Sequence, residues 1–392
     1  MRRESKQRRT AAGFTLVELL VAMVIGLITV VVIGQVMAVA EERKRAITSG
    51  ADTTLNGALA LYTVERDVKS AGYGLTTVLS ALGCEIRMKY GGGPTKTLTM
   101  SPISIIDGVD GAPDAIRTLA SDKVGISLPT RVTVDHAAEA ANFFVESDVG
   151  IQENDLMVAV PETPSATNWC SLFEVTKDGG GGGGGGGGQG QNQVLHSPGQ
   201  SEWNHPGGQT IFPSSGYPTN SYLVNLGRFL DHTYDIAGSN LRLTRFDSAT
   251  GAAPAQDLFS QIVQLQAVYG KDADGDCVVD TWEATQPTTI AQWQQLRALR
   301  IALVARSLVP EKDVVTLNEA DLAAAGKCNT ATPNPAVVCW RPNPGVATSG
   351  VAIKLDTTGA DWQRYRYRVF ESTIPVRNLV WLQKTGNPAC AL

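Results

Sequence analysis

Residues 13–45 read GFTLVELLVAMVIGLITVVVIGQVMAVAEERKR, and this stretch decides the fold. Positions 14–40 form a run of 27 residues with a single charged side chain, Glu18. About 20 apolar residues in a helix are enough to cross a bilayer core. A short leader with five basic residues and one acidic residue precedes the run. The sequence therefore predicts a membrane-spanning helix whose leader stays in the cytoplasm.

Three kinds of N-terminal segment compete for this pattern. An ordinary signal peptide cleaved after Ala40 would have an apolar core far longer than the ~7–15 residues that such signals use. A twin-arginine signal would use one of the arginine pairs of the leader, but Glu18 is wrong for its apolar core. The hexapeptide at 13–18, Gly-Phe-Thr-Leu-Val-Glu, resembles the class III signal of type IV prepilins. Only this third interpretation accounts for Glu18.

The prepilin resemblance implies how the N-terminus is processed. A prepilin peptidase would cut after Gly13 and methylate the new N-terminal residue, Phe14. Glu18 would then be the fifth residue of the mature chain. A lone carboxylate in hydrocarbon is costly. We therefore expect Glu18 to pair with the α-amino group of Phe14 on a neighbouring subunit, the alternative being a protonated glutamate that faces lipid.

The helix is predicted to continue beyond the membrane. Apolar residues recur every four positions at Ile47, Ala51, Leu55 and Leu59, and the stripe extends through Tyr62, Val64 and Val68. Gly72 and Gly74 then end it. The predicted helix covers 14–70, with 14–40 in the membrane. Gly34, Gly50 and Gly57 are expected to be points at which it bends or melts.

The rest of the chain is predicted to be a β-rich head, because turn-forming Gly, Pro, Ser and Thr are frequent in it. The predicted strands are 156–160, 222–230, 241–246, 261–269, 299–306 and 365–370, and a short helix is predicted at 290–296. The unbroken glycine run at 179–188 is expected to be a surface loop. We expect this loop, taken as 179–190, to separate a first part of the head, 71–178, from a second, 191–392. The fold class is therefore α+β.

Three further segments resemble PilW-type minor pilins. They are 65–74 with Cys84 downstream, 268–270 followed by an Asp-rich loop and 297–307, and 367–370 followed by 374–378. Residues 85–220 resemble no family. The resemblance implies a low-abundance structural subunit that helps to start pilus assembly. Its implied partners are prepilin peptidase, other major and minor pilins, and the inner-membrane assembly machinery. It would lie in the inner membrane with a periplasmic head, and later in the pilus.

Two other functions share the N-terminal motif, namely a type II secretion pseudopilin and a pilus-tip adhesin that binds through residues 85–220. An enzyme is not expected, because the sequence holds no HExxH or GxSxG motif and no correctly spaced P-loop. No residue is assigned a catalytic role, and no cofactor is required. The formal net charge is −5, of which the leader alone contributes +4, so the remaining chain is acidic. A partner nucleic acid is therefore not expected.

The segment 272–283, DADGDCVVDTWE, is a candidate structural calcium loop. Calcium takes six to eight oxygen ligands, and an EF-hand-like loop supplies them from positions 1, 3, 5, 7, 9 and 12. Those positions are Asp272, Asp274, Asp276, the Val278 carbonyl, Asp280 and Glu283. Cys277 occupies position 6, where glycine normally makes the sharp turn. The alternative is a hydrated acidic turn.

The six cysteines of an exported chain predict disulfides, because they would lie in an oxidising compartment. Six cysteines allow 15 pairings, and the sequence does not choose among them. Cys328 and Cys339 are close together and bracket a Pro/Asn-rich loop, so they are the favoured pair.

Overall fold

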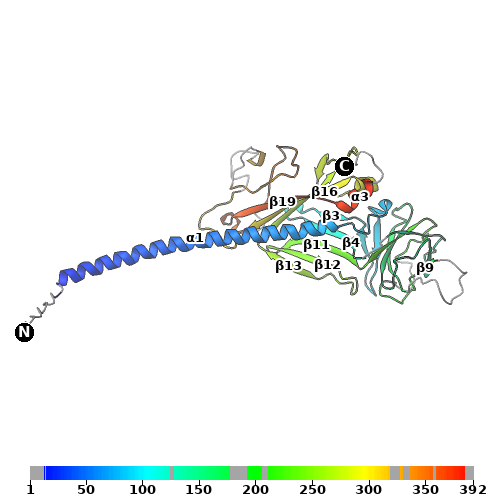
Figure 1. Ribbon diagram of the computed structural model, residues 1–392, viewed down its shortest axis with the longest axis horizontal. Helices are drawn as coiled ribbons and strands as arrows, with labels where there is room; N and C mark the ends of the chain where they lie inside the picture. The colour runs from blue at the N-terminus through cyan, green and yellow to red at the C-terminus, as the bar shows by residue number, and fades with distance from the viewer. Residues whose placement is uncertain are drawn as a thin grey trace, which may run out of the picture. The chain divides into compact units, whose positions relative to one another are not determined.

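The computed structural model describes residues 13, 15–123, 128–176, 192–204, 211–317, 327–329, 336–355 and 359–384. The chain divides into two compact units, Met1–Asp52 and Thr53–Leu392. Helix α1 (Leu16–Ser70) runs through both, and the strands all belong to the second unit, the head (Figure 1). The predicted α+β fold, a long N-terminal helix followed by a β-rich head, is confirmed.

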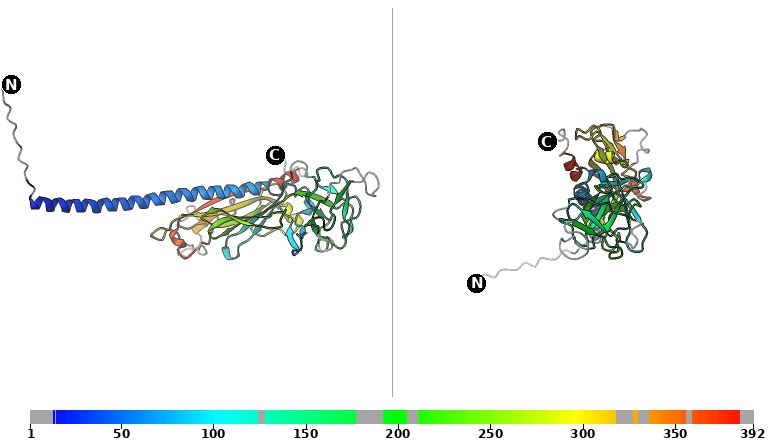
Figure 2. Two further views of the ribbon diagram at one scale, coloured as in Figure 1. Left: turned by 90° about the horizontal axis from the view of Figure 1, so that it is seen from below. Right: turned by 90° about the vertical axis from the view of Figure 1, so that its right-hand side faces the viewer.

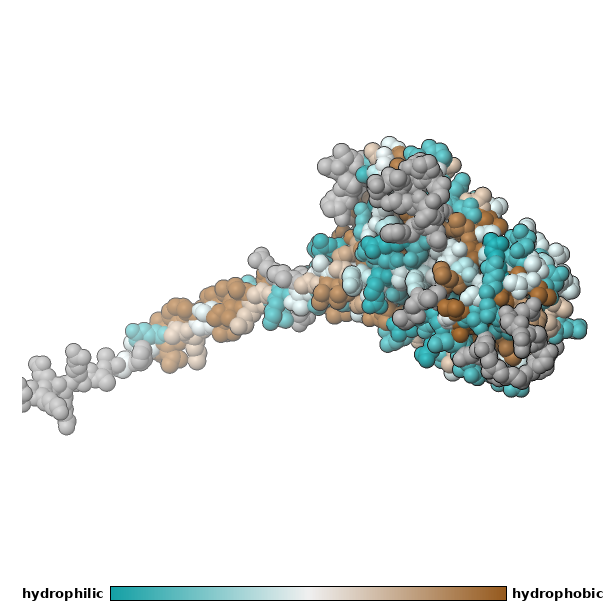
Figure 3. Space-filling model, turned by 45° about the vertical axis from the view of Figure 1, so that its right-hand side comes forward, coloured by the Kyte–Doolittle hydropathy of each residue, from teal (hydrophilic) through white to brown (hydrophobic). Residues whose placement is uncertain are grey.

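The first unit is dominated by the apolar half of α1. Residues Leu16–Glu41 form a helix that is long and apolar enough to cross a membrane. Its apolar side chains are exposed all round, and Figure 3 shows this stretch as a largely hydrophobic surface. A helix that is hydrophobic all round is typical of a membrane span or of a buried core. The predicted helix began two residues earlier, at Phe14, which lies outside the described residues.

The second half of α1 packs into the core of the head. Ala60, Val64 and Val68 are fully buried, whereas Leu55 and Tyr62 of the predicted apolar stripe are 58% and 63% exposed. The helix therefore has two apolar faces, and only one contacts the head. A Cβ atom at Gly57 would lie 2.1 Å from the ring of Phe370. This glycine therefore lets strand and helix approach closely, and α1 continues through it.

Two antiparallel sheets share this core with α1 (Figures 1 and 2). The first is a meander with the spatial order β13 (Ala255–Ser260), β12 (Asn240–Arg245), β11 (Phe229–Ala237), β4 (Ala115–Ser121) and β3 (Ile103–Ile106). The second has the order β15 (Thr281–Glu283), β14 (Ile262–Lys271), β16 (Leu296–Arg306) and β19 (Tyr367–Pro375). The strands predicted at 241–246, 261–269, 299–306 and 365–370 are confirmed, with ends shifted by a few residues. The strand predicted at 222–230 is wrong as a single strand, because it is divided at Arg228 between β10 (Tyr222–Gly227) and β11, which belong to different sheets.

Both faces of β16 are buried, which explains its strongly apolar sequence. Leu299, Ile301 and Leu303 face the core shared with α1. Ala302 and Val304 face a second cluster, built with β17 (Cys339–Trp340), β18 (Val351–Ala352) and their surroundings. Three short helices complete the described elements near these sheets: α2 (Ile290–Gln294), α3 (Arg377–Lys384) and the 3-10 helix η5 (Trp362–Arg364).

A third sheet forms a separate lobe of the head. Its spatial order is β2 (Lys96–Thr99), β1 (Glu85–Met88), β8 (Cys170–Glu174), β7 (Leu156–Val160), β10 (Tyr222–Gly227) and β5 (Thr130–Arg131). A two-stranded ribbon, β6 (Asn142–Val145) with β9 (Asn192–Leu195), accompanies it. The remaining short 3-10 turns are η1 (Leu79–Ala81), η2 (Val109–Gly111) and η3 (Lys327–Asn329).

The glycine run does not divide the head as expected from the sequence. Strand β6 before it pairs with β9 after it, and β7 pairs with β10. The run itself lies outside the described residues. Most of this lobe is one insertion, because residues 122–228, with β5 to β10, lie between β4 and β11, which are directly paired neighbours. Strands β1 and β2, which come before β3 in the chain, complete its sheet. Long insertions at a hairpin tip leave the flanking pair intact.

Candidate functional sites in the helix start and the aspartate loop

The start of α1 is closed by a reciprocal cap between Thr15 and Glu18. The Glu18 Oε2 atom accepts hydrogen bonds from the Thr15 backbone N–H and hydroxyl, both at 2.9 Å. The Glu18 N–H donates to the Thr15 hydroxyl at 3.2 Å. This is a capping box, and the Thr-x-x-Glu spacing in the sequence is its signature. The sequence interpretation assigned Glu18 to assembly and missed Thr15.

A second polar contact fixes the head half of α1 to β11. One oxygen of Asp67, Oδ2, accepts from His232 Nδ1 at 2.8 Å and from the Tyr234 hydroxyl at 2.6 Å. Burial alone would raise the pKa of Asp67, but these two hydrogen bonds outweigh it and hold that pKa below its usual value. The ionised carboxylate therefore sets the position of the helix along the sheet.

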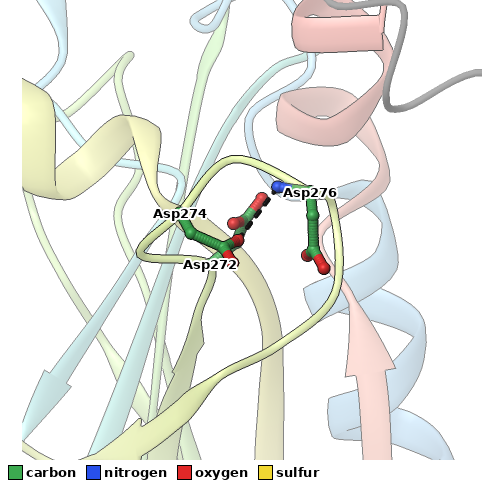
Figure 4. A group of neighbouring side chains, drawn as sticks. All are labelled: Asp272, Asp274 and Asp276. Atoms are coloured by element: carbon green, nitrogen blue, oxygen red, sulfur yellow. Dashed lines mark hydrogen bonds between the residues drawn. The ribbon is translucent and has the colours of Figure 1, made fainter.

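The candidate calcium loop follows β14 and brings three aspartates together. Ligand atoms of Asp272, Asp274 and Asp276 all lie within 4.8 Å of one another (Figure 4). The Asp276 N–H donates to Asp274 Oδ1 at 3.1 Å. Asp272 is buried, while Asp274 and Asp276 are exposed. The arrangement offers carboxylate oxygens, which are the ligands that Ca²⁺ prefers.

Asp272 is already held by several donors. It accepts from the Gly275 N–H at 2.6 Å, from the Cys277 N–H at 2.8 Å and from Arg297 Nε at 3.0 Å. Burial raises the pKa of Asp272, but these donors and the Arg297 charge together hold it below its usual value. The carboxylate is therefore ionised at neutral pH and shares its charge with Arg297.

The other predicted ligands make contacts of their own in the loop and in β15. Glu283 is in β15 and accepts from Lys271 Nζ at 2.5 Å. Asp280 accepts from the Ala273 N–H at 2.6 Å, which closes the loop across its base. Val278 is exposed and donates its N–H to Asp276 at 2.7 Å. The structure thus gathers Asp272, Asp274 and Asp276, whereas Asp280 accepts from the Ala273 N–H and Glu283 from Lys271.

Cys277 has the backbone conformation that the loop position requires. Its φ angle is +69°, in the left-handed region that glycine adopts most easily. The sequence interpretation expected strain at this residue if the loop made the sharp turn of a calcium site. Cys277 does adopt this left-handed conformation, and it is disulfide-bonded.

Two other disulfides lie within the described residues. Cys328 and Cys339, the pair favoured from the sequence, are joined, with their Cα atoms 5.5 Å apart. Cys84 is joined to Cys170 across the parallel pair β1 and β8, a pairing that the sequence did not suggest. This bond links the chain just after α1 to the inserted lobe.

We predict that Cys277 pairs with Cys390 within one chain. Cys277 is disulfide-bonded, and the described residues join Cys84 to Cys170 and Cys328 to Cys339. The prediction names Cys390 because it is the remaining cysteine of the sequence, and it lies outside the described residues. Peptide mapping without reduction should show this link in the monomer. A Cys277 peptide joined to the same peptide of a second chain would contradict it. Cys277→Ser with Cys390→Ser should leave the other two links unchanged.

Comparison with known proteins identifies the family. Residues 232–378 match the family model described as Type IV Pilus-assembly protein W, and residues 8–34 match the prokaryotic N-terminal methylation motif. A type IV-like pilin from Thermus thermophilus is similar in structure, with a TM-score of 0.35 and 9% identity, over 83% of this chain and 96% of that one. No curated protein matches. The two family matches, at the helix start and across both core sheets, show that the chain is a type IV minor pilin of the PilW type that takes part in pilus assembly.

Proposed function

We propose that the chain is made as a single-pass inner-membrane precursor with its leader in the cytoplasm and its head in the periplasm. Prepilin peptidase cuts it after Gly13 and methylates Phe14, and the mature subunit then joins other major and minor pilins near the filament tip or in a priming complex. The observation that carries this proposal is the match of residues 8–34 to the methylation motif at the start of an apolar helix. The role is structural, with no chemical step.

We predict that the charge of Glu18, and not its cap, is needed for filament entry. Glu18→Val should insert and be cut, since removing a charge makes the span cheaper in lipid, yet it should enter filaments at about a tenth of the normal level or less. Glu18→Gln keeps an N3 side chain that can complete the cap but removes the charge, and should fail equally. The measurement is the amount of the subunit in sheared pili relative to the membrane.

Thr15→Val is the matched control for this experiment. It removes the two cap hydrogen bonds that use the Thr15 hydroxyl and leaves the backbone N–H of residue 15 and the carboxylate charge in place. It should enter filaments nearly normally, because an N-cap contributes only about 1 kcal/mol. If Thr15→Val fails as Glu18→Val does while Glu18→Gln succeeds, the cap is the function of Glu18 and the intersubunit pair is refuted.

Two alternative functions are separated by simple observations. If the chain is a type II secretion pseudopilin, deleting its gene should stop protein secretion and leave pili intact.

The inserted lobe, 122–228, favours an adhesin as the second alternative, because it precedes the residues that match the family model. Deleting 85–220 would not test it, because β3 and β4 of the core sheet fall in that range. Polar substitutions of exposed Val134 and Val149 should instead weaken adhesion in cells that remain piliated.

We also propose that the loop 272–283 holds a structural Ca²⁺ of low affinity. Asp272, Asp274, Asp276 and the Val278 carbonyl would hold it, and the ion would offset the repulsion among the carboxylates. Arg297 already neutralises part of the Asp272 charge, and Glu283 would have to leave Lys271 to join. Both features favour a Ca²⁺ dissociation constant of ~10⁻⁴ to 10⁻³ M, as in the calcium sites of extracellular protein modules.

Calcium is therefore expected to raise the melting temperature of the detergent-solubilised full chain. At a hundredfold excess over Kd the stabilisation is about 2.7 kcal/mol, and Mg²⁺ should substitute poorly. Asp274→Asn should abolish the rise, whereas Glu283→Gln should keep it if three aspartates make the site. Asp247→Asn, which alters an aspartate turn of the other sheet, is the matched control. Identical melting with chelator and with millimolar calcium would mean that the loop is an acidic turn.

A further inference from the structure

One end of the head carries a compact surface built from two chain segments, Arg306–Val314 and Asp361–Arg368, which we call the base face. The first segment follows β16 and the second leads into β19. Their backbones are joined by hydrogen bonds from the Ser307 N–H to the Arg366 carbonyl at 2.8 Å and from the Glu311 N–H to the Arg364 carbonyl at 2.7 Å. The base face is therefore one surface and not two independent loops.

The base face lies at the end of the head where α1 begins its head half. The Thr53 hydroxyl donates to the Arg306 carbonyl at 3.2 Å, and Arg368 Nη1 donates to the Thr54 hydroxyl at 2.9 Å. From there α1 and β19 run side by side until Asn378 Nδ2 donates to the Ser70 carbonyl at 3.1 Å (Figure 1). The base face thus surrounds the point at which the head is attached to the rest of the chain.

The side chains of the base face combine exposed apolar and basic groups. Leu308, Val309 and Val314 are 59%, 49% and 53% exposed. The two segments hold five basic and three acidic side chains, a net charge of +2 in a chain whose net charge is −5. The exposed basic residues are Lys312, Arg364, Arg366 and Arg368. Exposed aliphatic residues beside arginine and lysine are what a protein presents to an anionic membrane interface.

The length of the connecting chain keeps this surface close to the membrane. Only eleven residues, 42–52, separate Glu41 at the end of the apolar span from Thr53 at the base face. As a helix they cover about 18 Å, and even fully extended they reach no more than about 40 Å. Whatever the orientation of the span, Thr53, whose hydroxyl contacts the Arg306 carbonyl of the base face, stays within that distance of the end of the span. Such a tether gives a high effective concentration, so weak individual contacts are sufficient.

We propose that the base face docks on the anionic surface of the membrane while the subunit is still anchored there. Leu308 and Val309 lie in the interfacial region, and the guanidinium group of Arg364 contacts a lipid phosphate. Arg366, whose Nε atom lies 2.7 Å from a carboxylate oxygen of Glu311, contacts a second phosphate through its remaining N–H groups. The proposal rests on the membrane anchoring proposed above. A docked head holds the precursor upright on the bilayer and is released when the subunit leaves the membrane for the filament.

Hydroxyl-radical footprinting of the full chain in lipid nanodiscs tests this docking. Oxidation of Leu308 and Val309 should fall at least about threefold in bilayers with about 30% anionic phosphatidylglycerol, relative to purely zwitterionic bilayers. The protection should be lost in about 0.5 M NaCl, which screens exposed charges. Val149, an exposed valine of the inserted lobe, is the internal reference and should be oxidised equally in both bilayers.

Paired variants separate docking from general effects of charge. Arg364→Gln with Arg366→Gln should abolish the protection of Leu308 and Val309. Arg228→Gln with Arg245→Gln alters two exposed arginines at the other end of the sheets and should leave it intact. Oxidation of the span, residues 16–41, reports on anchoring itself and should be low in every sample.

The possible results distinguish the docking of the base face from the membrane anchoring on which the proposed function rests. An oxidised span means that the chain is not anchored, and the proposed function fails. A protected span with Leu308 and Val309 equally oxidised in both bilayers overturns the docking proposal alone. Protection that rises with the number of subunits per nanodisc, independently of lipid charge, also overturns it, because the base face then binds a second copy of the chain.

Discussion

Gly13→Leu is expected to abolish processing and leave all of the protein as the precursor. The peptidase has to accommodate the chain at the Gly13–Phe14 bond, and a branched side chain at 13 obstructs that approach. The structure removes misfolding as an explanation, because a Cβ atom at Gly13 meets no heavy atom within 4 Å. The uncut leader keeps five basic residues beside the apolar helix. Such charges are costly in the apolar interior of a membrane or filament, so no subunit should enter pili.

Intact-mass spectrometry of the membrane fraction measures this result. The wild-type chain should begin at Phe14 and carry one extra methyl group, whereas Gly13→Leu should keep the leader. Gly26→Leu is the matched control, since a Cβ atom at Gly26 also meets no neighbour and Gly26 lies within α1, away from the bond that is cut. It should be cut normally. A wild-type chain that begins at Glu41, or a cut Gly13→Leu chain, would contradict the prepilin interpretation.

Local sequence patterns predicted the elements that depend on near neighbours in the chain. The apolar run and its four-residue continuation predicted α1, and alternation in 299–306 predicted β16. The short helix α2 begins with a capping box between Thr289 and Gln292, again a local signal. In each case the residues that decide the conformation lie within a few positions of one another, so one window of sequence contains the information.

The parts that the sequence did not predict depend on contacts between distant residues. No local pattern tells that 122–228 is inserted between paired strands, or that Cys84 meets Cys170. The calcium loop shows the same limit, because spacing alone offered Glu283 as a ligand. The pairing of β15 with β14 instead places Glu283 opposite Tyr269 and beside Lys271. Sheet register overrides the loop pattern there.

A buried histidine pair in the inserted lobe was also beyond the reach of local patterns. His136 and His196 are 60 positions apart, and their Nε2 atoms lie 2.9 Å from each other. Both side chains are buried, and His136 stacks on Phe143 with ring centroids 3.7 Å apart. The Nδ1 atom of His136 has no hydrogen-bond partner among the described residues. Glu139 and His196 both line a small cavity of the lobe.

Burial favours the neutral form of the His136 and His196 rings. Burial lowers the pKa of His136 to about 4. Burial, followed by repulsion from His136, lowers the pKa of His196 to about 3. In the unfolded chain both titrate near their ordinary value of ~6.5. Between these values the unfolded state binds more protons than the folded state, so stability is lost as the pH falls below about 6.5.

Acidification from pH 8 to pH 5 is therefore expected to cost the folded head about 2 kcal/mol for each of the two histidines. Asp114 acts in the opposite direction, because burial raises its pKa to about 6 and its proton stabilises the fold by about 1 kcal/mol at pH 5. The net loss is thus about 3 kcal/mol, measured as the change in unfolding free energy by urea titration of the detergent-solubilised chain.

His136→Gln and His196→Gln should each remove about half of the histidine contribution to this loss, whatever their effect on stability at pH 8. His232→Gln, which alters the histidine bound to Asp67, should leave the loss in place. If both lobe variants lose as much stability as the wild type between pH 8 and pH 5, the buried pair is not the acid-sensitive element of the head.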